Sequence, residues 1–259
     1  MSVSVIRKPS IFLYKGIKHM RKSKKIGVII AAAGQGKRMK NDVSKQYIEI
    51  DGKPIVAYTI EKFQKSNLVD EIILVVGENE IGYIEKYIKN RYNFTKVKSI
   101  VSGGKDRQDS VFEGIKVLSD DVDIILVHDG VRPMIDVEAI DYIIEETIKY
   151  KACIFGVNAK DTIKVVDEYK NVADTPDRNL LYAIQTPQAF EKGLLLNAYK
   201  RSMKEGFRGT DDSMLVERFT DIKVKVVEGS YMNIKITTPE DLQFFKEYMN
   251  CGSTDKNKR

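Results

Sequence analysis

Four positively charged residues within or just after a glycine loop are candidates for binding and transferring phosphate groups. The segment 29–47, "IIAAAGQGKRMKNDVSKQY", runs from apolar residues into a glycine-containing loop that carries Lys37, Arg38, Lys40 and Lys45. Backbone N–H groups of such a loop can hold a triphosphate, and Lys and Arg can follow negative charge as it moves during phosphoryl or nucleotidyl transfer. The pattern predicts a phosphate-binding loop, although any one of these cations alone would be interpreted as a solvated surface residue.

Two familiar phosphate-binding loops do not fit this segment. A Walker loop requires Ser or Thr after its Lys, and here Arg38 follows Gly36 and Lys37. A dinucleotide-binding loop requires a third glycine where this chain has Met39. A single G-x-G is equally compatible with a plain turn after a strand. The loop alone therefore leaves its ligand open.

Three further polar segments follow or flank apolar runs in the predicted fold. They are "SGGKDRQDS" at 102–110, "HDGVRP" at 128–133 and "MNIKITTPED" at 232–241. Each has a plain alternative, as a helix cap, a strand end or a solvated strand. Open α/β sheets, however, bind ligands at the carboxyl ends of their strands. The joint placement of these segments at strand ends favours one shared polar site.

Short apolar runs are the elements that must position this site. Nearly continuous β-branched runs, separated by segments of helical period, predict parallel strands with helices on both faces. The predicted strands are 26–33, 71–76, 97–101, 123–128 and 151–157. The fold class is therefore α/β, with a doubly wound sheet.

The pattern changes at 158–185, where polar and apolar residues alternate around "DEYKN". This predicts a β-hairpin arm that projects from the sheet and packs on a second subunit, because an isolated hairpin buries too little by itself. Two helices (191–204 and 211–219), a strand (221–229) and a terminal helix (237–249) follow. Thr238 is the predicted N-cap of the last helix.

Composition limits the class of protein. The net charge of +6 comes from the ends of the chain, since residues 1–25 hold eight Lys/Arg and no acid, whereas residues 26–254 carry a net charge of −4. This argues against a nucleic-acid partner. No apolar stretch has transmembrane length, and the two cysteines form no metal-binding pattern. We expect no membrane association, no metal held by the protein, and a reducing, cytoplasmic location.

The domain organisation follows from the same observations. We expect a basic, disordered extension at 1–25, which could also be a transit peptide or reflect a start at Met20. One domain should span 26–250, with 158–185 as its dimerisation arm. Residues 251–259 should form a disordered tail.

The motifs together resemble a known family. In order they are "AAAGQGKRM", "SKQY", "GGKDRQDSV", "VHDGVRP", "AKDTIK", "DRNLLYAIQTPQAF", "TDDSMLVE" and "NIKITTPEDL". They resemble those of the 2-C-methyl-D-erythritol 4-phosphate cytidylyltransferases, from about Ile26 to about Tyr248. The resemblance implies a Rossmann-like nucleotidyltransferase fold, with a mostly parallel twisted sheet flanked by helices and a projecting β-arm. It implies a homodimer that transfers the cytidylyl group of CTP to methylerythritol phosphate and releases pyrophosphate.

The resemblance also implies roles for individual residues. The implied catalytic residues are Arg38, Lys45 and Lys235. The implied CTP-binding residues are Ala32, Ala33, Gly34, Gly36, Gly104 and Ser110. The implied residues for the alcohol phosphate are Asp129, Arg132, Thr162, Thr186 and Arg178, the last reaching the partner's site from the arm. Mg²⁺ would be the cofactor, held mainly by the nucleotide phosphates.

Three positions depart from the family pattern. Ser44 stands where proline commonly precedes the catalytic lysine, Lys105 where an acid is frequent, and Met232 where an acid is common. Two alternatives stay open: a ribitol-5-phosphate cytidylyltransferase and a non-catalytic nucleotide-binding module. "DRNLLYAIQTPQ" favours the methylerythritol enzyme, and the retention of three cations argues against the silent module.

Overall fold

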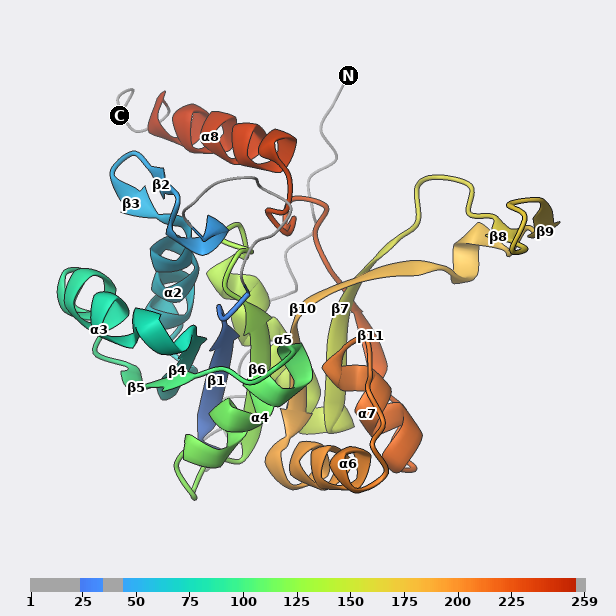
Figure 1. Ribbon diagram of the computed structural model, residues 1–259, viewed down its shortest axis with the longest axis horizontal. Coiled ribbons are helices and arrows are strands. Elements are labelled where there is room, and N and C mark those ends of the chain that lie inside the picture. The colour runs from blue at the N-terminus through green and yellow to red at the C-terminus, as the bar shows by residue number, and fades with distance from the viewer. Residues whose placement is uncertain (1–23, 35–43, 255–259) are drawn as a thin grey trace, which may run out of the picture.

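A seven-stranded sheet forms the centre of the computed structural model, which describes residues 24–34 and 44–254, with side chains up to Asn250. The strand order is β11-β7-β10-β6-β1-β4-β5 (Figure 1). The strands are β1 (Ile26–Ala31), β4 (Glu71–Val76), β5 (Val97–Ser102), β6 (Ile124–Asp129), β7 (Ala152–Asn158), β10 (Tyr182–Glu191) and β11 (Lys225–Glu228). All pairs are parallel except those of β10, which runs antiparallel between β6 and β7. The mostly parallel α/β sheet expected from the sequence is confirmed.

The five predicted parallel strands are present and point the same way. The strand predicted at 26–33 ends two residues earlier, at Ala31, and the one predicted at 221–229 is confined to β11. Along β1 the side chains alternate between the two faces of the sheet. Val28 and Ile30 enter one core cluster while Ile29 enters the other. This period-2 alternation, with apolar residues on both faces, is why the strand sequences are nearly continuous hydrophobic runs.

Strand β10 is not predicted from the sequence, where its first residues fall within the expected arm. Pro187 is atypical of a central strand, because proline cannot donate to the hydrogen-bond ladder. The structure accommodates it at an irregularity, since the register between β10 and β7 shifts between Ile184 and Gln188. This strand brings Thr186 to the end of β6, where Asp129 lies.

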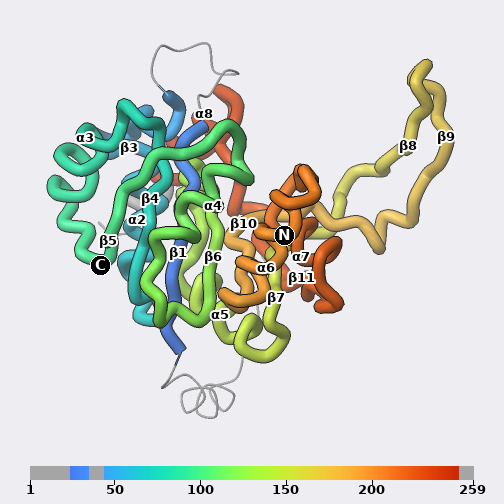
Figure 2. Tube along the Cα trace, turned by 60° about the horizontal axis from the view of Figure 1, so that its bottom comes forward, coloured from blue at the N-terminus to red at the C-terminus, as the bar shows by residue number. Residues whose placement is uncertain are grey.

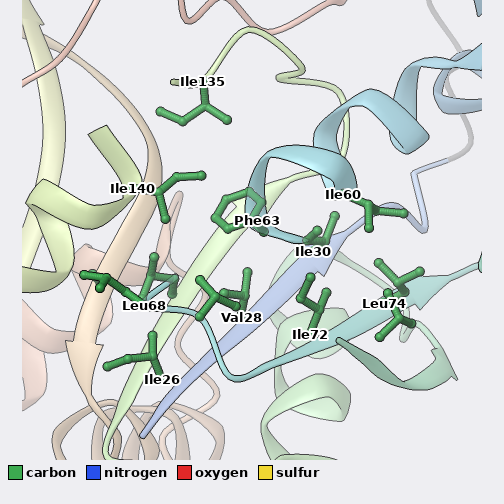
Figure 3. Packing of buried hydrophobic residues seen from close by; sticks show 14 of the residues in the cluster. Ile26, Val28, Ile30, Ile60, Phe63, Leu68, Ile72, Leu74, Ile135 and Ile140 are labelled. Carbon is green, nitrogen blue, oxygen red and sulfur yellow. The ribbon is translucent and has the colours of Figure 1, made fainter. Parts of the chain in front are cut away.

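Helices cover both faces of the sheet, as predicted. One face is covered by α2 (Ile55–Lys65) and α5 (Val137–Tyr150), and the other by α4 (Arg107–Val117), α6 (Lys192–Lys204) and α7 (Asp212–Phe219). Figure 3 shows the first of these cores, where Phe63 of α2 lies over Val28 and Ile30 of β1. Short turns of helix, α3 (Ile81–Ile84) and η4 (Glu85–Asn90), follow β4 and are not predicted from the sequence.

A third apolar cluster lies above the carboxyl ends of the strands. It joins α8 (Pro239–Thr254) to the hairpin of β2 (Glu49–Ile50) and β3 (Lys53–Pro54), with Phe245 and Ile55 buried between them. Thr238 accepts the Asp241 N–H at 3.3 Å, so the predicted start of the terminal helix is confirmed. The helix continues to Thr254, four residues into the segment expected to be a tail.

The predicted arm projects away from the sheet in both views (Figures 1 and 2). Its tip is a small antiparallel hairpin of β8 (Val165–Val166) and β9 (Val172–Asp174), around the predicted turn. The apolar side chains of the arm are exposed, with Leu180 at 79% and Val172 at 60%. Within the described part of the chain, no helix is long and apolar enough to span a membrane.

Candidate active site

A single buried carboxylate with three cations around it marks the carboxyl end of β6. Asp129 is 5% exposed. Its Oδ2 lies 3.0 Å from Lys235 Nζ and 3.3 Å from Arg132 Nε, and its Oδ1 lies 3.5 Å from Arg107 Nε. The cations come from the segment before α8, the loop after β6 and the start of α4. We call these four residues the Asp129 cluster.

The charges of the cluster hold one another in the ionised state. Burial alone would raise the pKa of Asp129, but the neighbouring Arg107, Lys235 and Arg132 outweigh it and hold that pKa well below its usual range. Burial lowers the pKa of Arg132 against the attraction of Asp129, yet a guanidinium stays charged near neutral pH. The cluster is thus a preformed group of cations with one carboxylate at its centre.

A neutral histidine lies beneath the cluster. His128 is fully buried, which lowers its pKa to about 3. Its Nε2 lies 3.2 Å from the Arg132 carbonyl oxygen, which can only accept, so Nε2 donates. Nδ1 then accepts the hydroxyl hydrogen of Thr186 at 3.1 Å, and Thr186 Oγ1 accepts the Asp129 backbone N–H at 3.1 Å. This chain of hydrogen bonds holds the end of β6 against β10.

Thr186 is therefore in the predicted place, but its hydroxyl hydrogen points to His128. Asn233, which the sequence analysis does not single out, connects the same parts. Its Nδ2 donates to the Thr186 backbone carbonyl at 2.9 Å, and the backbone carbonyl of Asn233 accepts from Arg132 Nη1 at 2.7 Å. Asn233 is 1% exposed, and its Oδ1 has no partner among the described residues. It ties a cation of the cluster to strand β10.

Arg107 is the cluster residue that sequence reasoning missed. It begins α4, where a positive charge opposes the helix dipole, and this unfavourable placement is the signal that the sequence offers. Its Nη2 lies 2.8 Å from Asp212 Oδ2, and Asp212 also accepts from the Tyr199 hydroxyl at 2.5 Å. Burial would lower the pKa of Arg107, but Asp212 and Asp129 raise it, so the arginine stays charged.

The glycine turns follow β1 and β5, the strands on either side of β4. A Cβ at Gly103 would lie 2.5 Å from Ala33 Cβ, so only glycine lets these turns approach so closely. The Gly104 N–H donates to Ser110 Oγ at 3.1 Å, and that hydroxyl donates to the Asp106 carbonyl at 2.7 Å. The side chain of Asp106 caps α4 by accepting the Asp109 N–H. The structure thus brings the predicted Ala33, Gly104 and Ser110 together, with Ser110 ordering the turn.

The other predicted residues lie in different places. Ala32 and Gly34 continue from β1 at the same edge of the sheet, and Lys45 begins the short helix η2 (Lys45–Tyr47). Gly36 and Arg38 lie outside the described residues. Thr162 and Arg178 are exposed and belong to the arm, where Arg178 Nη1 donates to the Lys160 carbonyl at 3.1 Å. The arm projects away from the central sheet of its own chain (Figure 1).

The donors at this edge do not suit a metal held by the protein. Within residues 24–34 and 44–250, no three His, Cys, Asp or Glu side chains are grouped so that they could hold a metal ion. Asp129, the one carboxylate at the centre, already has three cationic neighbours that would repel a divalent ion. The arrangement suits an anion instead, because Arg and Lys present N–H donors to phosphate oxygens.

Comparisons with known proteins agree with this geometry. The family model for 2-C-methyl-D-erythritol 4-phosphate cytidylyltransferase matches residues 26–250. Proteins of that name from Caldanaerobacter subterraneus subsp. tengcongensis and Alkaliphilus oremlandii are 47% and 45% identical, over 84% and 89% of this chain and 95% and 97% of theirs. A solved 4-diphosphocytidyl-2C-methyl-D-erythritol synthase from Anaerococcus prevotii superimposes with a TM-score of 0.80 at 40% identity, covering 90% of this chain and 99% of that one.

Proposed function

The chain belongs to the 2-C-methyl-D-erythritol 4-phosphate cytidylyltransferase family, and from this premise we propose how its site performs the reaction. It is a nucleotidyltransferase that transfers the cytidylyl group of CTP to 2-C-methyl-D-erythritol 4-phosphate. The products are 4-diphosphocytidyl-2-C-methyl-D-erythritol and pyrophosphate. The observation that carries our account of the site is the Asp129 cluster, a buried carboxylate that keeps three cations together.

The cluster binds the phosphate of the alcohol substrate. Asp129 Oδ2 contacts both Arg132 Nε and Lys235 Nζ, which leaves further N–H donors of both side chains for phosphate oxygens. Arg107 adds a third positive charge beside them. Because the cations are already in place, binding the phosphate needs little reorganisation, which is the condition for strong electrostatic stabilisation. Thr186 supports the site indirectly: its Oγ1 accepts the Asp129 N–H and so positions the end of β6. Its hydroxyl hydrogen goes to His128 and not to the phosphate.

The chemical step needs no general base. The phosphate of the alcohol is largely ionised at neutral pH, since its second pKa is about 6. One of its oxygens attacks the α-phosphorus of CTP, a new P–O bond forms, and the bond to the β-phosphate bridge breaks so that pyrophosphate leaves. His128 stays neutral and buried, so it takes no part in proton transfer. Catalysis comes from holding two polyanions together and stabilising the charge on the α-phosphate.

The nucleotide occupies the adjacent strand ends. We assign its binding to Ala32, Ala33, Gly34, Gly36, Gly104 and Ser110, and the stabilisation of its triphosphate to Arg38 and Lys45. Gly34 and Gly104 are exposed at this edge, so a ligand can approach their backbone. Mg²⁺ would be held by the nucleotide phosphates, in keeping with the cationic surroundings of Asp129. Cys153 has a buried free thiol, which suits the reducing, cytoplasmic location that we propose.

The arm completes the site in a homodimer. Its Val165, Val172 and Leu180 are large apolar side chains that are exposed in the single chain, and contiguous exposed apolar patches mark interaction sites. We assign Thr162 and Arg178 to the alcohol phosphate in the partner's site. Mixing Asp129→Asn with Arg178→Ala chains tests this, because one site of each mixed dimer would regain both intact residues. Activity above that of either variant alone supports the shared site, and a simple average of the two contradicts it.

Pyrophosphate release tests the function itself. The full chain is incubated with CTP and Mg²⁺ and, in parallel, with methylerythritol 4-phosphate or ribitol 5-phosphate. Release with methylerythritol phosphate alone is the expected result. Release with ribitol phosphate alone would retain the nucleotide site but overturn the acceptor. If the chain binds CTP but releases no pyrophosphate with either acceptor, a catalytic role is contradicted.

A further inference from the structure

A carboxylate outside the predicted site holds Ser44 and Tyr47, which lie on either side of Lys45 in the chain. Glu80 ends the short helix η3 (Glu78–Glu80), which follows β4. Its Oε1 accepts from Ser44 Oγ at 3.2 Å, and its Oε2 accepts from the Tyr47 hydroxyl at 2.6 Å and from the Gly77 N–H at 2.8 Å. Lys45 lies between Ser44 and Tyr47 in the chain. The connection after β4 is therefore tied to the start of η2 by two side-chain hydrogen bonds.

The same turn is attached to β1 by a second contact. Gln46 is 2% exposed and its Nε2 donates to the Ala32 carbonyl at 2.8 Å. Tyr47 stays a hydrogen-bond donor because burial, reinforced by Glu80, raises its pKa well above the ordinary value. Its ring also meets Tyr83 edge-on at 5.5 Å. The residues on both sides of Lys45 are thus anchored to neighbouring strands.

The backbone of Ser44 explains why an anchor is useful here. Its φ of −57° and ψ of 131° are values that proline adopts readily. A proline ring at this position would hold φ by itself. Serine leaves φ free to vary, but its hydroxyl reaches Glu80. The hydrogen bond supplies the constraint that the proline ring would otherwise supply.

We propose that Glu80 is a positioning residue for Lys45. It holds the start of η2 in place so that Lys45 meets the triphosphate at one defined position, and it does so through Ser44 and Tyr47 without touching the substrate. This inference rests on the proposed role of Lys45. Small displacements of a catalytic group can reduce rates by about a hundredfold, so even a modest loosening should be measurable.

The central experiment compares Glu80→Ala, Ser44→Pro and the two together. Glu80→Ala should lower kcat/KM for CTP by about tenfold or more, because Lys45 then occupies many positions. The KM for the alcohol should change by less than about twofold, since the Asp129 cluster is untouched. Ser44→Pro in the Glu80→Ala background should restore most of the lost rate, because proline replaces the missing constraint. A role in folding alone would lower the melting temperature without this pattern.

Two further variants keep the result interpretable. Ser44→Ala with Tyr47→Phe removes the same two hydrogen bonds while leaving Glu80 and η3 intact, so it serves if Glu80→Ala fails to fold. Glu71→Ala is the matched control: Glu71 also accepts from a backbone N–H and a hydroxyl, both of Ser119, but at the opposite edge of the sheet. It should lower stability and leave kcat/KM unchanged.

The outcomes separate this inference from the proposed function. The dissociation constant for CTP, measured by calorimetry, should rise by about tenfold in Glu80→Ala whether or not the alcohol is turned over. A wild-type chain that binds CTP but releases no pyrophosphate would overturn the function and still test the anchor. Wild-type turnover with equal rates and CTP affinity in Glu80→Ala would overturn the anchor. So would a loss of rate that Ser44→Pro does not restore.

Discussion

The two edges of the central sheet both carry charged side chains, but the charges are arranged differently. At the carboxyl edge, Asp129 is almost fully buried among three cations. At the amino edge, cations and acids pair one to one and in partial contact with solvent, as in Lys24–Asp123 and Lys25–Asp121. Strand β6 joins the two, since Asp123 precedes it and Asp129 ends it.

The buried cluster at the carboxyl edge is suited to binding an anion, whereas the paired charges at the amino edge are not. Exposed pairs contribute little to folding and nothing to binding an anion, because each cation already has its acid. A group of cations that shares one buried carboxylate is costly to assemble unless a ligand completes it. The neutral His128, Thr186 and Asn233 behind the Asp129 cluster hold that costly arrangement in place. The four predictions that follow test the contrast, from the largest expected effect to the smallest.

Asp129→Asn should disrupt the Asp129 cluster at the carboxyl edge of the sheet. Without the carboxylate, Arg107, Arg132 and Lys235 repel one another and separate, so the alcohol phosphate loses its preformed site. We expect kcat/KM to fall by about a hundredfold or more, comparable with the loss of one preorganised donor. Pyrophosphate release under steady-state conditions measures it. The control is Asp123→Asn at the other end of β6, and equal activities of the two variants would refute the contrast between the edges.

Acidification should lower the free energy of unfolding, because His128 at the carboxyl edge is buried in its neutral form. Its pKa is about 3 in the folded chain and near 6.5 when unfolded. Between these values the unfolded chain binds a proton that the folded chain does not, so stability falls as pH falls. The expected loss in the free energy of unfolding is about 1.6 kcal/mol between pH 6.5 and pH 5. Urea unfolding at both pH values measures it.

The control for this pH dependence is His128→Gln, which can keep one donor and one acceptor but does not titrate. Its free energy of unfolding should vary much less over the same range. A pH dependence as steep as in the unmodified chain would mean that other groups cause it. Glu71→Ala, at the amino edge, should retain the full dependence on pH.

Glu71→Ala should affect stability and leave activity intact. It removes two hydrogen bonds to a carboxylate, from the Ser119 N–H at 2.8 Å and the Ser119 hydroxyl at 2.5 Å. We expect a loss of about 1.5 kcal/mol in the free energy of unfolding, the lower end of the range for one hydrogen bond to a charged group. Chemical denaturation gives the stability and pyrophosphate release the activity. A large loss of kcat/KM would show that the amino edge also serves the reaction.

Lys25→Ala should have the smallest effect. The side chain pairs with Asp121, which is 69% exposed, so water and salt screen the pair. The backbone N–H of residue 25 would still donate to Asp123. We expect no measurable change in melting temperature or in kcat/KM. A clear drop in melting temperature would show that the exposed pairs do stabilise the strand ends.

Much of the fold can be predicted from local pattern. The strand at 71–76 is found with its predicted bounds, and the α/β class follows from strands that alternate with helices. Strand β10 could not be predicted, because its polar residues and Pro187 oppose strand propensity and only its neighbours β6 and β7 stabilise it. Tertiary pairing overrides local preference there.

The candidate site divides in the same way. Asp129, Arg132 and Lys235 are predicted, and the structure brings them together, while their roles stay predictions. Thr186 is predicted as a ligand, but the structure directs its hydroxyl hydrogen to His128. Arg107 and Glu80 lie within or beside segments of ordinary polar composition, and nothing local shows that their partners are Asp212 and Tyr47.

Motif order, apolar period and glycine positions are local properties, so they can be read from the chain before its fold is known. Which charges meet depends on how distant segments pack. Arg107 and Asp212 are 105 residues apart in the chain, and nine helices and strands separate Asp129 from Lys235. The folded sheet brings each pair into contact. The physical reason is that the energy of a charge depends on burial and on its neighbours in space. Burial and spatial neighbours are set when β10 pairs within the sheet and α8 covers its edge. They therefore cannot be predicted from any local pattern of residues.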